Sequence, residues 1–184
     1  MAPVGVTLRP ITKQDATTIA QLHIRSWRSA YRGILTDLYL DGAIEDERLA
    51  TWRSRLDGSD SAGFGFVAEQ GHEHPVGFVY AYPDADSEWG TLIDNLHVMA
   101  EARGSGIGRR LMAAVAQQLP DVASHTRMHL WVFSANTAAI RFYERVHGAP
   151  VEQVHRDAPD GGTYAEWRYG WTDPTVLLTD DRGR

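Results

Sequence analysis

The spacing of apolar residues divides the chain into expected helices and strands. Apolar residues three and four positions apart share one face of a helix, and this spacing recurs over 15–31, 44–56 and 107–119 and again after residue 136. Short apolar stretches bounded by polar turns predict strands at 4–11, 64–69, 76–82, 89–99, 130–133, 151–155 and 164–171. The expected order is therefore β-α-α-β-β-β-α-β-α-β-β, an α/β (α+β) arrangement with no repeat and no domain boundary.

The most informative segment joins the expected strand 89–99 to the helix 107–119. It contains three alternating glycines, at positions 104, 106 and 108. Glycines where a helix begins let the backbone approach a ligand closely and leave N–H groups pointing outward. The positive end of the helix dipole lies behind these groups, so the turn is suited to a phosphate or pyrophosphate. Arg103, Arg109 and Arg110 add positive charge around it.

Several interpretations of this turn are open from its residues alone. A Walker-type loop needs Gly-Lys-Ser/Thr, which is missing, and a dinucleotide-binding fingerprint needs its last glycine one residue later. A tight turn without a ligand is a third interpretation. The turn also resembles the acyl-CoA pyrophosphate loop of the GCN5-related N-acetyltransferases (GNAT), Arg/Gln-x-x-Gly-x-Gly, which residues 103–108 match at every specified position.

A second block further along the chain resembles another part of the same signature, Asn-x-x-Ala-x-x-Phe-Tyr-Glu. It runs over residues 136–144, after the expected strand 130–133, with Asn136 placed to cap a helix. Two matched blocks at the expected separation are more specific than either alone. The resemblance, over about residues 6–171, implies the GNAT fold, a mixed and mostly antiparallel central sheet flanked by helices. We expect one domain over 1–172 and a polar tail over 173–184, with residues 175–178 packing onto the body.

The resemblance implies an N-acetyltransferase that moves an acetyl group from acetyl-CoA to an amine of a small molecule or peptide. The sequence contains no cysteine, which excludes an acyl-cysteine intermediate and favours direct transfer. Two alternatives stay open. The protein would sense acetyl-CoA without turning it over, or it would use a longer acyl-CoA.

The resemblance assigns acetyl-CoA binding to three parts of the sequence. Amides of the glycine turn would hold the pyrophosphate, and the backbone of the central strand would pair with the pantetheine arm. Asn136 would bind the cofactor, cap its helix, or do both. The residues expected to bind acetyl-CoA are Leu96, His97, Val98, Arg103, Gly104, Ser105, Gly106, Ile107, Gly108, Arg109 and Asn136.

Tyr143 is the expected catalytic acid, because by analogy the family's tyrosine at this place points at the thioester sulfur and its phenol suits protonation of a thiolate. The simpler alternative is a core residue beside Phe142. Where many relatives carry a glutamate base, this chain has Leu92. Asp94 is then the preferred candidate, to attract a cationic amine or act through a water, unless it is only a surface residue or pairs with an arginine. His97 is a second candidate, expected on the opposite face because the separation is odd. A neutral amine would need no base.

The acceptor pocket is expected to come from the N-terminal helices, where Trp27 and Tyr31 would form an aromatic wall or simply belong to the core. The glycine that usually closes the helix after Phe-Tyr-Glu is replaced by His147. The helix is therefore expected either to end there in a left-handed conformation or to slip by one residue. The turn with His72 and His74 is expected to be a solvated loop, and no metal site is predicted.

Charge and hydropathy exclude some partners. The net charge of −6 and the scattered arginines argue against nucleic-acid binding. No apolar run has the length of a membrane span, and the N-terminus lacks the features of a signal peptide, so a cytoplasmic location without membrane attachment is expected. A homodimer is an expectation from family habit alone.

Overall fold

The computed structural model describes residues 5–42, 44–58, 63–71 and 74–179; Val4 and His72, which the expected first strand and histidine turn include, lie outside them. The strands are β1 (Val6–Pro10), β2 (Phe64–Gln70), β3 (Pro75–Asp86), β4 (Gly90–Val98), β5 (Met128–Phe133), β6 (Ala149–Asp157) and β7 (Thr163–Trp171). The α-helices are α1 (Ala16–Ala30), α2 (Asp37–Asp41), α3 (Ile44–Leu56), α4 (Ile107–Val122) and α5 (Thr137–Arg145). Three short 3-10 helices are η1 (Lys13–Asp15), η2 (Ala100–Ala102) and η3 (Pro174–Leu177).

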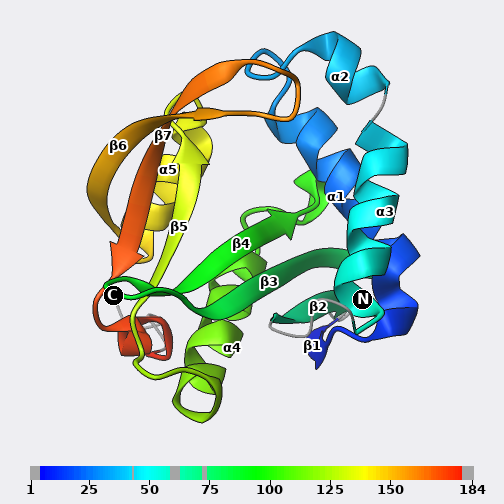
Figure 1. Cartoon of the computed structure of the whole chain (residues 1–184). Coiled ribbons are helices and arrows are strands. Elements are labelled where there is room, and N and C mark those ends of the chain that lie inside the picture. The colour runs from blue at the N-terminus through cyan, green and yellow to red at the C-terminus, as the bar shows by residue number, and fades with distance from the viewer. Residues whose placement is uncertain (1–4, 43, 59–62, 72–73, 180–184) are drawn as a thin grey trace.

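The strands form a seven-stranded sheet in the order β1-β2-β3-β4-β5-β7-β6. Neighbouring strands are antiparallel except β4 and β5, which are parallel. Helices α1 and α3 cover one face of the N-terminal half of the sheet and α4 covers the other, while α5 lies against β5 and β7 (Figure 1). The expected mixed, mostly antiparallel sheet flanked by helices is confirmed.

The apolar stripe of α4 explains why this helix lies where it does. Its five members are all buried against β2, β3 and β4: Ile107, Leu111, Met112, Val115 and Leu119. Full burial of one such side chain contributes about 1.5–3 kcal/mol, so the stripe sets which face of α4 meets the sheet. Because α4 is held in this way, its first turn comes to a defined position beside β4.

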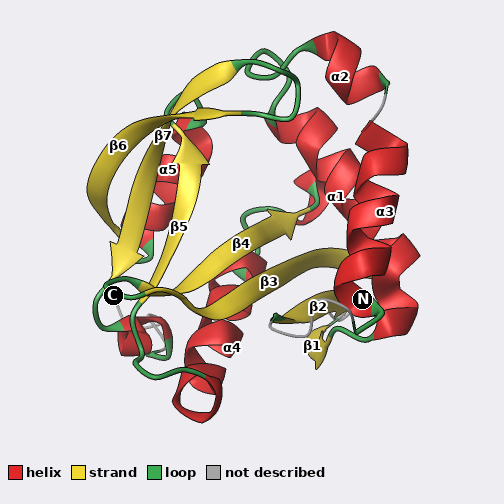
Figure 2. Ribbon diagram, in the orientation of Figure 1, coloured by secondary structure: helices red, strands yellow, loops and turns green. Residues whose placement is uncertain are grey.

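Strands β4 and β5 pair over a very short distance. Their register contains only two residue pairs, Thr91 with Met128 and Leu92 with His129. Beyond Leu92 the two strands diverge, and the sheet opens into a V between the end of β4 and the end of β5 (Figure 2). Among the described strands, none pairs with this edge of β4 from Ile93 to Val98.

A β-bulge at Asp94 changes the direction of β4. Tyr80 pairs with Asn95, but the next residue of β3, Ala81, pairs with Ile93, so Asp94 is an extra residue. Both Asp94 and Asn95 consequently reach Arg55 of α3, at 2.8 and 2.9 Å from its Nη1. The prediction that Asp94 and His97 lie on opposite faces is wrong, because the bulge interrupts the strict alternation of side chains.

Helix α2 was not expected from the sequence. Its five residues are too few to show a helical period, and it is fixed by tertiary contacts: Tyr39 and Leu40 are buried, and Arg32 bonds both Asp37 and Asp41. The C-terminal segment behaves as expected in its first part. Leu177, in η3, is buried in the same core cluster as α4.

Helix α5 ends through a left-handed histidine. His147 has φ of +66°, which confirms the first of the two alternatives for this position. The next residue is glycine for a different reason: a Cβ on Gly148 would lie 2.5 Å from an atom of the Trp171 ring. The helix end therefore depends on a strained residue followed by a close backbone-to-ring approach.

We predict that His147→Gly stabilises the protein by about 0.5–1 kcal/mol, because glycine removes the left-handed strain at the cost of some unfolded-state entropy. Gly148→Ala should instead destabilise it, because the added Cβ meets Trp171. Urea unfolding of both variants would test this, and loss of stability in His147→Gly would contradict it.

Candidate active site

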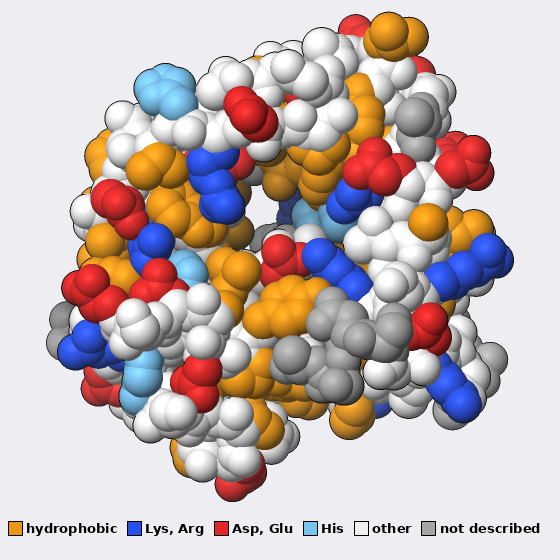
Figure 3. All heavy atoms as spheres, in the orientation of Figure 1, with side chains coloured by type: hydrophobic (Ala, Val, Ile, Leu, Met, Phe, Trp, Pro, Cys, Tyr) orange, Lys and Arg blue, Asp and Glu red, His pale blue; other side chains and the backbone are white. Residues whose placement is uncertain are grey.

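A cavity of about 560 Å³ lies where β4 and β5 diverge. Its walls come from α1, the end of β4, the glycine turn, β5 and α5, and the space-filling view shows the molecule hollowed near its centre (Figure 3). Many of the predicted site residues line this one cavity: Tyr31, Leu96, His97, Val98, Arg103, Gly104, Gly106, Ile107, Gly108, Asn136 and Tyr143.

The glycine turn has the conformation that an anion site requires. Gly104 and Gly106 have φ of +78° and +82°, and no heavy atom lies within 4 Å of a Cβ placed on either one. Helix α4 begins only at Ile107, so its first N–H groups lack partners within the helix. Among the described residues, no backbone acceptor takes the N–H of Gly104 or Gly106. Gly104, Gly106, Ile107 and Gly108 line the cavity, so the N-terminus of α4, the positive end of its dipole, borders it.

Gly108 has a packing role instead. A Cβ at this position would lie 3.0 Å from the Phe142 ring of α5. The glycine therefore allows α4 and α5 to approach each other. This contact joins the two sequence blocks in space and brings the glycine turn to the helix that carries Tyr143.

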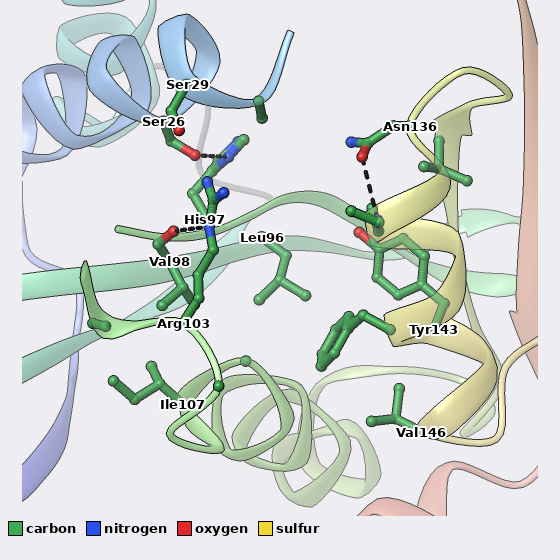
Figure 4. Close-up of a pocket in the computed structure, with 18 of the residues that line it drawn as sticks. Ser26, Ser29, Leu96, His97, Val98, Arg103, Ile107, Asn136, Tyr143 and Val146 are labelled. Atoms are coloured by element: carbon green, nitrogen blue, oxygen red, sulfur yellow. Dashed lines mark hydrogen bonds between the residues drawn. The ribbon is translucent and has the colours of Figure 1, made fainter. Parts of the chain in front are cut away.

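The open edge of β4 forms the floor of the cavity. Leu96 and Val98 line it, and Arg103 folds back so that its Nε donates to the Val98 carbonyl at 3.1 Å (Figure 4). On this edge the backbone N–H and C=O groups of β4 are open to a further strand, because β5 pairs with β4 only at Thr91 and Leu92. An extended ligand can pair there in place of a strand.

Tyr143 belongs to the hydrophobic core and also lines the cavity. Its ring packs against Tyr169 and Trp171, each about 6.0 Å away between centroids, and its hydroxyl points into the cavity (Figure 4). Burial raises the pKa of the Tyr143 phenol above its ordinary value, and nearby Tyr31 adds to this. The hydroxyl is therefore protonated at neutral pH and able to donate.

Asn136 caps α5, its side-chain oxygen accepting a hydrogen bond from the Ala139 N–H at 3.2 Å, and it also lines the cavity. The cap fixes the side chain, while the amide NH₂ group remains a donor of its own. The capping role expected from the sequence is thus seen directly.

His97 is held as a neutral imidazole. Its Nδ1 lies 2.9 Å from the Ser26 hydroxyl, and its ring lies 4.7 Å from that of His23. Burial, helped by the charges of Arg103 and Arg48, lowers the pKa of His97 to about 3. A group with this pKa retains a proton poorly, so His97 is a weak candidate for the base.

Comparison with known proteins agrees with this geometry. The sequence model of the Acetyltransferase (GNAT) family matches residues 20–149. An uncharacterized N-acetyltransferase of Bacillus subtilis, YuaI, is 28% identical over 95% of this chain and 97% of its own. The "Probable N-acetyltransferase Rv2775" of Mycobacterium tuberculosis is 30% identical over 79% of this chain and 80% of its own. The crystal structure of the PaiA N-acetyltransferase of Thermoplasma acidophilum in complex with coenzyme A is similar in fold, with a TM-score of 0.69 at 16% identity, covering 90% of this chain and 98% of that one.

The chain belongs to the GNAT acetyltransferase family. It is an N-acetyltransferase, as its sequence relatives are. Within the described residues of this GNAT protein, no helix is long and apolar enough to cross a membrane. Nor do the described His, Asp and Glu side chains form a group of three or more that would hold a metal ion.

Four side chains predicted for the GNAT site lie elsewhere. Ser105 is outside the cavity lining, and its hydroxyl donates to the Ala102 carbonyl at 2.6 Å. Asp94 is paired with Arg55 outside the cavity lining. Arg109 turns toward the C-terminal segment and donates to the carbonyls of Val176 and Thr179, which α4 holds against its first turns. Trp27 packs between His23 and Tyr31 and leaves the lining to Tyr31. The core alternative for Trp27 and the arginine-paired alternative for Asp94 therefore describe what is seen.

Other lining residues were not foreseen. Ser26 and Ser29 face the cavity from α1, and Trp131 faces it from β5. Small polar residues within a helix give no sequence signal of a site. Trp131 stands in a stretch where every neighbour is apolar as well, so its exposure to the cavity depends on the divergence of β4 and β5.

The buried His97 makes stability depend on pH. Its pKa is about 3 when folded and about 6.5 when unfolded, so below pH 6.5 the unfolded chain binds a proton that the folded protein does not. We predict that between pH 7 and pH 5 this residue alone reduces the free energy of unfolding by about 2 kcal/mol. His97→Gln, whose amide can still bond Ser26, should lose about that much less in urea unfolding over the same range. The exposed His155→Gln is the control, and equal pH slopes for both variants would overturn the assignment.

Proposed function

We propose that this enzyme transfers an acetyl group from acetyl-CoA directly to an amine of a small molecule or peptide, in the cavity between β4 and β5. One observation carries the proposal. A cluster of free N–H groups, an open strand edge and a buried phenol hydroxyl meet in a single cavity.

The described residues fit acetyl-CoA. The amides of residues 104–108 would hold the pyrophosphate, with Arg103 beside them, because a helix N-terminus with free donors suits anions. The backbone at 96–98 would hold the extended pantetheine arm. PaiA, which shares the fold, was solved with coenzyme A, and this supports a CoA thioester as the donor.

Acetyl-CoA supplies the acetyl group and a sulfur leaving group that must take up a proton when the C–S bond breaks. Tyr143 would donate it, because its hydroxyl faces the cavity and is protonated at neutral pH. Such acid catalysis typically contributes about 10²–10⁴-fold to the rate. No cysteine exists to carry the acetyl group, so both substrates occupy the cavity together.

The amine is proposed to react in its neutral form without a dedicated base. The described lining of the cavity contains no carboxylate, and His97 is a poor proton acceptor. An ammonium form would lose its first proton before or as it enters. The N–H proton released when the amide forms would return to the Tyr143 oxygen, which has given its own proton to the leaving thiolate. This choice follows the third of the alternatives that the sequence left open.

The donor site is tested by acetyl-CoA calorimetry on Gly106→Val, which places a side chain in the anion site. We predict that this change weakens acetyl-CoA binding by about 100-fold or more. Gly161→Val is the matched control, since Gly161 also has a positive φ of +85° and open space around it, but lies in the β6–β7 turn. Both variants place valine at a similar positive φ, and only Gly106→Val should lose binding. Wild-type protein that binds no acetyl-CoA at millimolar concentration would end the proposal.

The acid is tested by Tyr143→Phe, which deletes the hydroxyl and keeps the ring in the core. We predict a fall in kcat of about 10²-fold or more with acetyl-CoA affinity nearly unchanged, measured by thiol release with an amine panel. Tyr169→Phe is the control, because its hydroxyl bonds Glu144 and its ring touches Tyr143. Unchanged kcat in Tyr143→Phe would remove the residue from the mechanism.

A further inference from the structure

The face of β5 and β7 that borders the cavity carries paired aromatic and charged side chains. Trp131 lines the cavity, and Arg168, opposite it on β7, has its guanidinium carbon 4.6 Å from the indole centroid. Side chains two residues apart on a strand share a face, so the next pair, Phe133 and Glu166, lies on this same face. A carboxylate is thus built into the sheet surface that turns toward the cavity.

Glu166 is outside the lining of the cavity but next to it: its cross-strand partner is Phe133, on the same sheet face as the lining residue Trp131. Phe133 packs edge-on against Tyr31, which also lines the cavity, 5.1 Å away between ring centroids. Burial and then the negative charge of Glu166 raise the pKa of Tyr31 to about 12. The contact between Phe133 and Tyr31 thus connects the position of Glu166 to the lining of the cavity.

This carboxylate is weakly paired. Its side chain is only 16% exposed, and its nearest cation, Arg156, keeps Nη1 3.6 Å from Oε2. No hydrogen bond from a described residue contributes to its pKa, which burial raises. The neighbouring Arg168, by contrast, is 2.9 Å from both Asp86 and Glu152. A sheltered carboxylate with free acceptor sites favours a cationic partner, because burial of a charge without partners is costly.

The position of Glu166 beside the cavity indicates which part of an acceptor it would meet. Tyr143 and Tyr31 both line the cavity, whereas Glu166 lies outside the lining, paired across the strands with Phe133, which packs on Tyr31. An acceptor that extends from Tyr143 past Tyr31 would therefore reach Glu166 last. The nitrogen that is acetylated has to lie at the Tyr143 end and be neutral, so a cation at Glu166 is a different group of the same molecule.

We infer that Glu166 binds a second, positively charged group of the acceptor, so that the enzyme prefers diamines to monoamines of the same length. The inference rests on the proposed acetyl transfer and specifies its acceptor. Phe133 and Tyr164 pack edge-on against each other next to this position, while the Trp131 ring already carries the guanidinium groups of Arg156 and Arg168, at 4.8 and 4.6 Å from its centroid. Arg156 competes for the same carboxylate and limits the preference.

The test uses α,ω-diamines from 1,3-diaminopropane to 1,8-diaminooctane, each with the monoamine of the same carbon number. Binding is measured by calorimetry on the CoA-saturated protein, and kcat/KM by thiol release. We predict that the wild type prefers the best diamine by about 10-fold or more and that Glu166→Gln removes this preference, leaving the monoamine within about 2-fold. Arg156→Gln should strengthen diamine binding, because it frees the carboxylate.

The opposite signs of the two variants separate ligand binding from structure. If Glu166 served only to pair with Arg156, Glu166→Gln and Arg156→Gln would change binding in the same direction, and each would change diamine and monoamine binding equally. That result, or equal wild-type binding of diamines and monoamines, overturns the inference. Glu152→Gln, which alters another carboxylate of this sheet face, is the control. Failure of the proposed function appears separately as absence of thiol release with every amine, while the calorimetric comparison still decides the role of Glu166.

Discussion

The site depends on the early separation of two parallel strands. After two residue pairs, β4 and β5 diverge, and everything that makes the cavity follows from this. Among the described strands, none pairs with the edge of β4 beyond Leu92. The glycine turn that follows β4 and the helix α5 that follows β5 both line the space between the two strands. A continuous pairing of β4 with β5 would satisfy the backbone groups of 93–98 and leave no room for an extended ligand. The bulge at Asp94 contributes to the separation, because an extra residue bends and twists the strand that contains it.

A second constraint holds the two halves of the cavity together. Helix α4 brings the N–H cluster and α5 brings Tyr143, and the helices meet where Gly108 faces Phe142. A side chain larger than hydrogen at position 108 would push this ring away, and with it the helix that positions the phenol. The alternating glycines therefore serve two purposes. Positions 104 and 106 need a left-handed backbone and open space, while position 108 needs a close approach between helices.

Local patterns predicted most of the fold, and tertiary contacts decided what they missed. Helix 44–56 has the bounds of α3, and the start of α4 at Ile107 follows directly from its apolar stripe. Helix α2 has too few residues to show a period. The glycine turn and Tyr143 could be proposed as neighbours in one site, and they do line one cavity, because two short motifs, far apart in the chain, each require unusual residues. Arg109 was assigned to the cavity because it is close in sequence to the glycine turn. A helix distributes neighbouring residues around its axis, however, and the Arg109 side chain points to carbonyls of the C-terminal segment.

Burial shifts the pKa values of Tyr143 and His97, two titratable residues of the cavity lining, in opposite directions, and both shifts favour the uncharged side chain. It raises the pKa of the Tyr143 phenol and lowers that of the His97 imidazole, so both side chains are uncharged at neutral pH. The charged side chains of the described lining are Arg103 and Arg145, and Arg103 lies beside the N-terminus of α4, whose dipole adds positive charge there. Glu166 lies outside the lining, on the sheet face next to Tyr31. On the proposed function, a negatively charged donor would bind at the N-terminus of α4 and a positively charged acceptor on the side of Glu166. The distribution of charge around the cavity, more than any single residue, would then orient the two substrates relative to each other.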